Sequence, residues 1–255
     1  MKKRVPLFIA FLLVSMTTSA QTITLRAAIN KAGLQRALSQ RMAKDYLLIG
    51  AGIRIEEAKA DMDEVTSIFN ENLHDLTLFA KAQDLKDALR MEESIWAKFR
   101  QVVTDTPDIS QATTIIKNSN DLLTISEIVV QKLQANNNNR GAKLTNECGR
   151  QRMYLQRIAM LYTAKYWEVP YTNLNKELSE SIEGFENGIN ILLATSENTM
   201  EIKELLKFQK SEWDFLKKSF DNLNNLKPAS VFSSTALMAK DFNKITTLYE
   251  GVAIN

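Results

Sequence analysis

Two arginine pairs are the residues of this sequence whose type and spacing could do chemistry. Arg36 and Arg41 lie five residues apart, and Arg152 and Arg157 repeat that spacing 116 residues later. A guanidinium is a permanent cation with planar, forked N–H donors, and this geometry suits carboxylates and other planar oxyanions. The pattern therefore predicts that arginine side chains recognise an anion.

A glycine stands three residues before the first arginine of each pair, at Gly33 and Gly149. Because glycine has no β-carbon, a partner helix can approach closely at that level. Arg36 and Arg152 would then face each other one turn on, where like charges repel and burial without a partner is costly. A small oxyanion between the two guanidiniums would relieve both problems, so we predict such a site. The open alternative is that both arginines pair with carboxylates or extend to solvent.

The second arginine of each pair is predicted to have a structural role. On a helix with 3.6 residues per turn, a spacing of five residues turns two side chains about 140° apart. Arg41 and Arg157 should therefore point away from the contact between the two arginine-bearing helices. Arg150 and Lys31 also stand beside the motifs, but they are weaker candidates because neither type recurs at the matching position.

The residue sets of common enzyme and metal sites are missing from the sequence. It has one histidine, His74, and one cysteine, Cys148, so zinc sites and nucleophile–histidine arrangements are not expected. No P-loop, dinucleotide fingerprint or helical His-Glu-x-x-His is found. We expect no enzyme activity, no metal and no cofactor, and the lone cysteine cannot form an internal disulfide.

The first twenty residues have the composition of a secretory signal peptide. Lys2, Lys3 and Arg4 precede an uncharged apolar run over 5–14, and a small-residue segment ends at Ala20. We predict cleavage near Ala20 and a periplasmic or secreted protein without a membrane-spanning helix. Removing the three positive charges lowers the net charge from +2 to −1, which argues against nucleic acid as a partner.

Helical periodicity runs through the rest of the chain. Apolar residues recur at spacings of three and four, and strong helix formers are abundant, which is typical of α-helices. The predicted fold class is all-α. Eight helices are expected, over residues 22–50, 57–80, 84–103, 110–135, 141–168, 173–194, 200–223 and 232–253.

An internal repeat divides the eight helices into two sets of four. Identical residues recur 116 positions apart, among them Asn30 and Asn146, Gly33 and Gly149, Arg36 and Arg152, Tyr46 and Tyr162, and Phe69 and Phe185. Trp96 recurs as Trp213 at an offset of 117, and Pro107 as Pro228 at 121. Several identities at one offset, followed in order by a tryptophan and a proline, indicate a duplication.

The repeat predicts the domain organisation. A signal peptide over 1–20 is followed by a first module over 21–135, a polar linker over 136–141 and a second module over 142–255. Each module is expected to be an up-down four-helix bundle, which begins and ends at the same pole. The short linker should then place the two bundles side by side as an intramolecular pseudo-dimer, and the protein should be a monomer.

The segment that opens each module resembles a known sensor family. Residues 30–42 follow the pattern Asn-x-x-Gly-x-x-Arg-x-x-x-x-Arg, and residues 146–158 follow it again. The pattern resembles the N-terminal sensor module of PilJ-type chemotaxis transducers and the P-box of NarX-type nitrate/nitrite sensor kinases. The resemblance implies a periplasmic helical bundle that senses a small anion through Arg36 and Arg152 at a dimer interface. The secondary residues of the motif are Asn30, Arg41, Asn146 and Arg157.

Two functions of different classes are compatible with these features. The first is an exported protein that binds or senses a small oxyanion such as nitrate or nitrite, without a signalling output domain of its own. The alternative is a ligand-free helical module that docks a membrane receptor, a transducer or a pilus-linked partner. A pocket lined by Arg36 and Arg152 would favour the first function, and a dry contact with both arginines salt-bridged would favour the second.

Overall fold

The computed structural model describes residues 23–135, 140–220 and 225–252, and its regular structure is entirely helical within these ranges. The prediction of an all-α protein is therefore confirmed. The predicted signal peptide over 1–20 lies outside the described residues. The helices are α1 (Leu25–Gly50), α2 (Ile55–Phe79), α3 (Gln83–Val103), α4 (Ile109–Ala135), α5 (Arg140–Tyr166), α6 (Leu174–Leu193), α7 (Met200–Lys217) and α8 (Pro228–Gly251).

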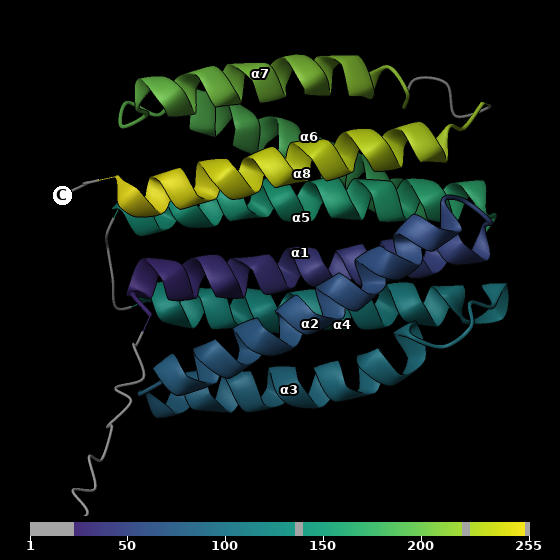
Figure 1. Ribbon diagram of the computed structural model, residues 1–255, viewed down its shortest axis with the longest axis horizontal. Helices are drawn as coiled ribbons and strands as arrows, with labels where there is room; N and C mark the ends of the chain where they lie inside the picture. Colours follow the sequence, from purple (N-terminus) through teal and green to yellow (C-terminus); the bar gives the residue numbers. More distant parts are fainter. Residues whose placement is uncertain (1–22, 136–139, 221–224, 253–255) are drawn as a thin grey trace, which may run out of the picture.

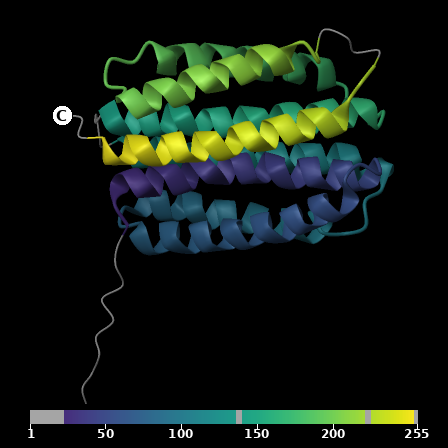
Figure 2. The same ribbon diagram turned by 45° about the horizontal axis from the view of Figure 1, so that its top comes forward.

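The helices form two groups that meet along one contact (Figure 1, Figure 2). Helices α1 to α4 pack on one another and make up the first helix group, and α5 to α8 make up the second. In the middle of the molecule α1 runs beside α5, and their contact is the most extensive between any two helices. We call this α1–α5 contact the seam.

Both seam helices are buried on nearly every side. α1 contacts α2 and α4 of its own group as well as α5, and α5 contacts α6, α8 and α1. A helix in such a position does not present one apolar stripe and one solvated face. Polar residues of α1 such as Gln35, Arg36 and Lys44 are consequently buried, and they need partners inside the protein.

The two helix groups repeat the same aromatic contact in their cores. Phe69 stacks on Trp96 with 4.3 Å between ring centroids, and Phe185 lies against Trp213 at the same distance. All four rings are buried. The indole N–H of each tryptophan donates to the residue that follows its phenylalanine partner, at 2.8 Å in the first group and 3.1 Å in the second. The recurring tryptophan is thus a core residue in both groups.

The register of α4 and α8 corrects one detail of the repeat. Buried positions of α4 recur on α8 at an offset of 116, so that Ile115, Ser119, Leu122 and Val129 correspond to Val231, Thr235, Met238 and Ile245. The interpretation that Pro107 corresponds to Pro228 is therefore wrong. Pro107 precedes α4, whereas Pro228 is the first residue of α8, a position where the missing N–H of proline leaves no helical hydrogen bond unmade.

Most helix ends differ from those predicted by one or a few residues, and the largest differences lie between α7 and α8. α5 begins at Arg140, so Arg140 and Gly141 of the predicted linker belong to its first turn, and residues 136–139 lie outside the described ranges. α7 ends at Lys217 and α8 begins at Pro228. Among the described helices, none is both long enough and apolar enough to cross a membrane.

Candidate functional site

The seam brings the two predicted arginines together. The exposed fraction is 1% for Arg36 and 3% for Arg152. A β-carbon placed on Gly149 would lie 3.1 Å from Nη2 of Arg152 and 3.3 Å from Nη2 of Arg36, and one on Gly33 would lie 3.0 Å from Nη2 of Arg36. The two guanidiniums therefore converge over both glycines. The missing β-carbons leave room for the guanidinium groups themselves, and not only for a close approach of the two helices.

Arg36 is neutralised by a carboxylate of its own helix group. Its Nη1 forms an ion pair with Glu127 of α4, and its Nη2 donates to Oδ1 of Asn146 on α5 at 2.8 Å. Burial lowers the pKa of Arg36, and the charge of Glu127 counteracts that shift. The alternative predicted for both arginines, pairing with a carboxylate, therefore applies to Arg36.

Arg152 has amide partners in place of a carboxylate. Its Nη2 donates to Oδ1 of Asn30 at 2.8 Å, and its Nη1 donates to Oδ1 of Asn243 at 2.9 Å. Its Nε is buried and has no hydrogen-bond partner. Within the described part of the chain, no carboxylate lies within ion-pair distance of this guanidinium.

The electrostatics of Arg152 follow from that set of partners. Burial, together with the charge of Arg36, lowers its pKa to about 10, while Cys148 and Glu250 act in the opposite direction. The side chain is still a cation at neutral pH. Among the described residues it is therefore a buried positive charge that lacks an ion pair and retains a free N–H, which is the state that a bound anion would stabilise.

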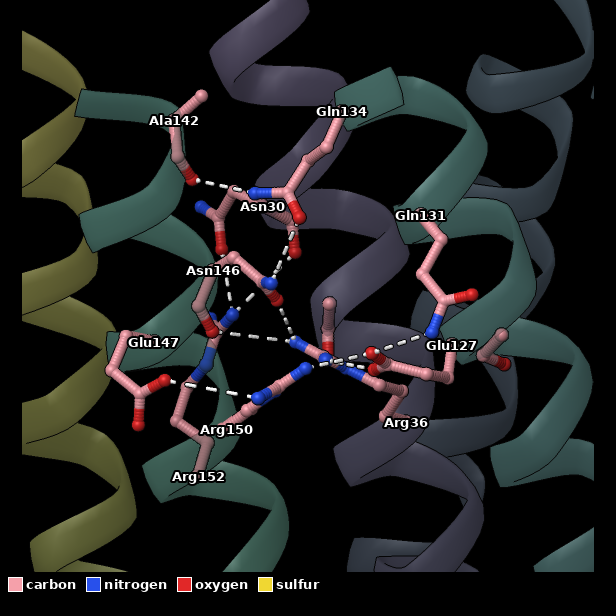
Figure 3. A network of polar contacts seen from close by, with 12 residues as sticks. Asn30, Arg36, Glu127, Gln131, Gln134, Ala142, Asn146, Glu147, Arg150 and Arg152 are labelled. Atoms are coloured by element: carbon pink, nitrogen blue, oxygen red, sulfur yellow. Dashed lines mark hydrogen bonds and ion pairs between the residues drawn. The ribbon is translucent and has the colours of Figure 1, made fainter. Parts of the chain in front are cut away.

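The motif asparagines link the two helix groups reciprocally across the seam. Asn30 of α1 accepts from Arg152 of α5, and Asn146 of α5 accepts from Arg36 of α1 (Figure 3). The sequence indicated these asparagines only as secondary members of the motif. Their role is to hold the opposite motif's guanidinium, so each motif is complete only when the other lies beside it.

The residues around Arg36 recur around Arg152, but the acidic residue stands at a different position in each group. Glu127 on α4 and Asn243 on α8 are 116 residues apart, and each accepts from Nη1 of its own group's arginine. Gln134 and Glu250 are also 116 residues apart, and they accept from Nδ2 of Asn146 and Asn30 respectively. In the first group the acid, Glu127, contacts Arg36 directly. In the second group the acid, Glu250, contacts Asn30, which in turn contacts Arg152.

Arg41 and Arg157 have ion pairs within their own groups. Arg41 pairs with Asp61 of α2, and Arg157 pairs with Glu177 of α6 at 2.6 Å. Arg157 also donates to Oε1 of Gln40 on α1 at 2.8 Å. The prediction that both side chains turn away from the seam therefore needs correction for Arg157, because the end of its long side chain reaches the first helix group.

A buried charge cluster beside Arg41 has no counterpart in the second group. Lys44 and Asp45 have exposed fractions of 1% and 0%, and Lys44 contacts Asp45 at 3.1 Å, Asp61 at 3.2 Å and Oε1 of Gln156 at 3.2 Å. Burial raises the pKa of Asp45 well above its usual value. The matching residues of α5 are methionine and leucine, so this cluster distinguishes the two groups and is not part of the repeated motif.

A surface cleft reaches the Arg36 side of the seam. It has a volume of about 370 Å³ and lies between α4 and α5, where its lining includes Arg36, Glu127, Arg150 and Tyr154. Glu127 and Arg150 were not identified as site residues from the sequence. Glu127 lies 91 residues after Arg36, so no short sequence pattern connects the two. Arg150 lies within the second motif, and its charge there was the one sequence feature that pointed to it.

A family model matches part of the chain. Residues 18–129 match the family PilJ, described as the N-terminal part of type IV pili methyl-accepting chemotaxis transducers. The match covers the first helix group up to α4 and includes the first arginine motif, as the resemblance of residues 30–42 predicted. Comparisons with curated proteins and with solved structures found no match.

Proposed function

We propose that this protein is an exported binding or sensing protein for a small oxyanion such as nitrate or nitrite, and the match of residues 18–129 to the PilJ family supports a sensor-like module. The anion binds at the seam, between the first domain and a second copy formed by α5 to α8. The observation that carries the proposal is Arg152, a buried cation with an unpartnered Nε and no carboxylate within ion-pair distance in the described residues.

Electrostatics favours an anion at this position. Arg36 and Arg152 converge over Gly149, and their like charges lower the pKa of Arg152. A buried charge is stabilised only by a partner of opposite sign and by hydrogen bonds that use its remaining donors. A planar oxyanion supplies several acceptors in a small volume, and each charge-assisted hydrogen bond contributes on the order of 1.5–3 kcal/mol.

The repeated contacts support the second copy. The two motifs hold each other's guanidiniums through Asn30 and Asn146, as two identical subunits would across a twofold axis. We infer that the chain is an intramolecular pseudo-dimer, a monomer that contains both halves of a site that a homodimer would otherwise assemble.

The other parts of the proposal rest on the sequence. The composition of residues 1–20 supports export, with the signal peptide removed near Ala20. A binding role without catalysis fits the absence of nucleophile–base pairs among the motif residues. The bound protein would present its ligand state to a membrane sensor or transducer.

A ligand-free interaction module is the second candidate function. The ion pair between Arg36 and Glu127 favours it, because one of the two buried arginines of the seam already has a counter-charge without a ligand. In that case the motif helices would serve only to join the two groups, and the protein would dock a membrane receptor or a pilus-linked partner.

Calorimetric titration with sodium nitrate and sodium nitrite at constant ionic strength tests the proposal. The parent is expected to bind one anion per chain, and Arg152→Ala should weaken binding about tenfold or more, because at least one charge-assisted hydrogen bond is lost. Arg90→Ala is the matched control, since Arg90 is exposed on α3 and pairs only with neighbours on its own helix. A parent that binds neither anion would rule out the oxyanion function and leave the interaction module.

A further inference from the structure

Glu127 has the partners that a bound oxyanion would have. Its Oε2 forms an ion pair with Nη1 of Arg36, and its Oε1 accepts from Nη2 of Arg150 at 2.8 Å and from Nε2 of Gln131 at 3.4 Å. Figure 3 shows the carboxylate facing both guanidiniums. A carboxylate is planar, carries one negative charge and offers forked acceptors, so it resembles a small free oxyanion in the features that arginine recognises.

Glu127 is charged under ordinary conditions. Burial raises the pKa of its carboxyl, but the charges of Arg36 and Arg150 and their hydrogen bonds outweigh burial and hold the pKa below its usual value. The side chain is 24% exposed and lines the cleft between α4 and α5. The carboxylate therefore sits at the boundary between the buried seam and solvent, with open space beside it.

The second group has a neutral amide at the same place. Asn243 stands 116 residues after Glu127 and accepts from Arg152. It is exposed on α8. The same position thus carries a negative charge beside one motif arginine and none beside the other, although the two arginines have matching environments in their asparagine contacts.

We propose that Glu127 is a tethered anion that occupies Arg36 and competes there with the free oxyanion, so that ligand affinity depends mainly on Arg152. The ligand identity rests on the proposed function, but the competition is a property of residues within the fold. The free anion meets Arg152 as its principal cation. Full use of Arg36 requires the carboxylate of Glu127 to move into the adjoining cleft.

Three variants test the competition by calorimetric titration with sodium nitrate at constant ionic strength. Glu127→Gln keeps the length of the side chain and a hydrogen-bond acceptor but replaces the charged carboxylate with a neutral amide, and we expect it to bind nitrate about tenfold more tightly than the parent. Glu147→Gln is the matched control, because Glu147 approaches Arg150 at 3.9 Å without contacting Arg36, and its affinity should stay within twofold of the parent. Arg36→Ala should weaken binding much more in the Glu127→Gln background than in the parent.

The outcomes separate this inference from the proposed function. If the parent does not bind nitrate but Glu127→Gln does, the tethered anion is supported and the proposed function is wrong for the natural chain. If the parent binds and Glu127→Gln matches it within twofold, the tethered anion is wrong and the proposed function stands. If neither binds, both are wrong.

If Glu127→Gln fails to fold, Asn243→Asp tests whether a tethered carboxylate competes with nitrate, this time at Arg152. The substitution keeps the size of an exposed side chain and places a carboxylate against Arg152, copying the arrangement at Arg36. We expect a higher melting temperature without nitrate, because a buried cation gains a partner, and at least a tenfold loss of nitrate affinity. An unchanged melting temperature together with an unchanged response to nitrate would overturn the inference.

Discussion

Glu127 and Asn243 occupy the same position of the two helix groups, 116 residues apart, and each accepts a hydrogen bond from the first arginine of its own group's motif. One is an acid and the other an amide. That single difference neutralises Arg36 and leaves Arg152 as a buried cation without an ion pair in the part of the chain that the structure describes. Two motifs that follow the same pattern of asparagine, glycine and arginine thereby acquire unequal electrostatic roles.

The two motif arginines should differ in their effect on stability. Arg36→Met removes an ion pair with Glu127 and should lower the free energy of unfolding by about 1–3 kcal/mol. Arg152→Met removes a buried cation without an ion pair, so the free energy of unfolding should stay within about 1 kcal/mol of the parent or rise. Urea denaturation without added nitrate measures both, with the exposed Arg90→Met as the control. Equal losses in the two variants would contradict the asymmetry.

The stability of the protein should depend on pH because the carboxyl of Glu92 is buried. Burial raises its pKa to about 7 from an ordinary 4.5, and the hydrogen bond from Ser126 offsets this only in part. Because the folded pKa is higher than the unfolded one, protonated Glu92 contributes its full stability below about pH 4.5. That contribution decreases from pH 4.5 and is lost as the pH rises through 7. With 1.36 kcal/mol per pKa unit, the loss is roughly 3 kcal/mol.

Glu92→Gln should remove this dependence. Gln209 already occupies the position 117 residues later on α7, the same offset as the two tryptophans, so the fold accommodates glutamine there. Relative to the parent, the variant should be more stable at pH 8 than at pH 4.5 by roughly 3 kcal/mol, measured by urea denaturation. Glu93→Gln, an exposed neighbour, is the control. A difference that does not change with pH would contradict the prediction.

Arg41 and Arg157 should act on stability and not on anion affinity. Arg41→Ala breaks the pair with Asp61, and Arg157→Ala breaks the pair with Glu177, so each should lower the free energy of unfolding by about 1–3 kcal/mol. Arg157→Ala should have the larger effect, because it also removes the hydrogen bond to Gln40 across the seam. Thermal unfolding and nitrate titration of both variants check this. A loss of nitrate affinity comparable to that of Arg152→Ala would assign them to the ligand site.

Gly149 should be needed for the guanidiniums to converge. Gly149→Ala places a methyl group 3.1 Å from Nη2 of Arg152 and 3.3 Å from Nη2 of Arg36. Alanine favours the helix by about 1 kcal/mol over glycine, so stability should change little while nitrate binds about tenfold more weakly, equivalent to about 1.4 kcal/mol. Gly251→Ala, where an added methyl meets no neighbour, is the control. Full nitrate affinity in Gly149→Ala would show that the ligand does not lie over this glycine.

The sequence alone was sufficient for the features that depend on short spacings. Helix formers and apolar periodicity are local properties, so the all-α class and the eight segments followed directly. The repeated motif indicated that Arg36 and Arg152 belong to one constellation, and the structure brings them together over Gly149. Where local signals are weak, at the ends of helices, the predicted boundary of α8 fell four residues after its actual start at Pro228.

Only the tertiary structure decided which partner each arginine has. Glu127 lies 91 residues from Arg36 in the sequence, and Asn243 lies 91 residues from Arg152, so no short spacing connects either pair. The register of α4 and α8 could not be read from their prolines, because Pro107 and Pro228 stand at different places relative to their helices. Side-chain contacts between distant segments depend on how helices pack. Packing determines which arginine receives a carboxylate and which, within the described residues, remains a buried cation with amide partners alone.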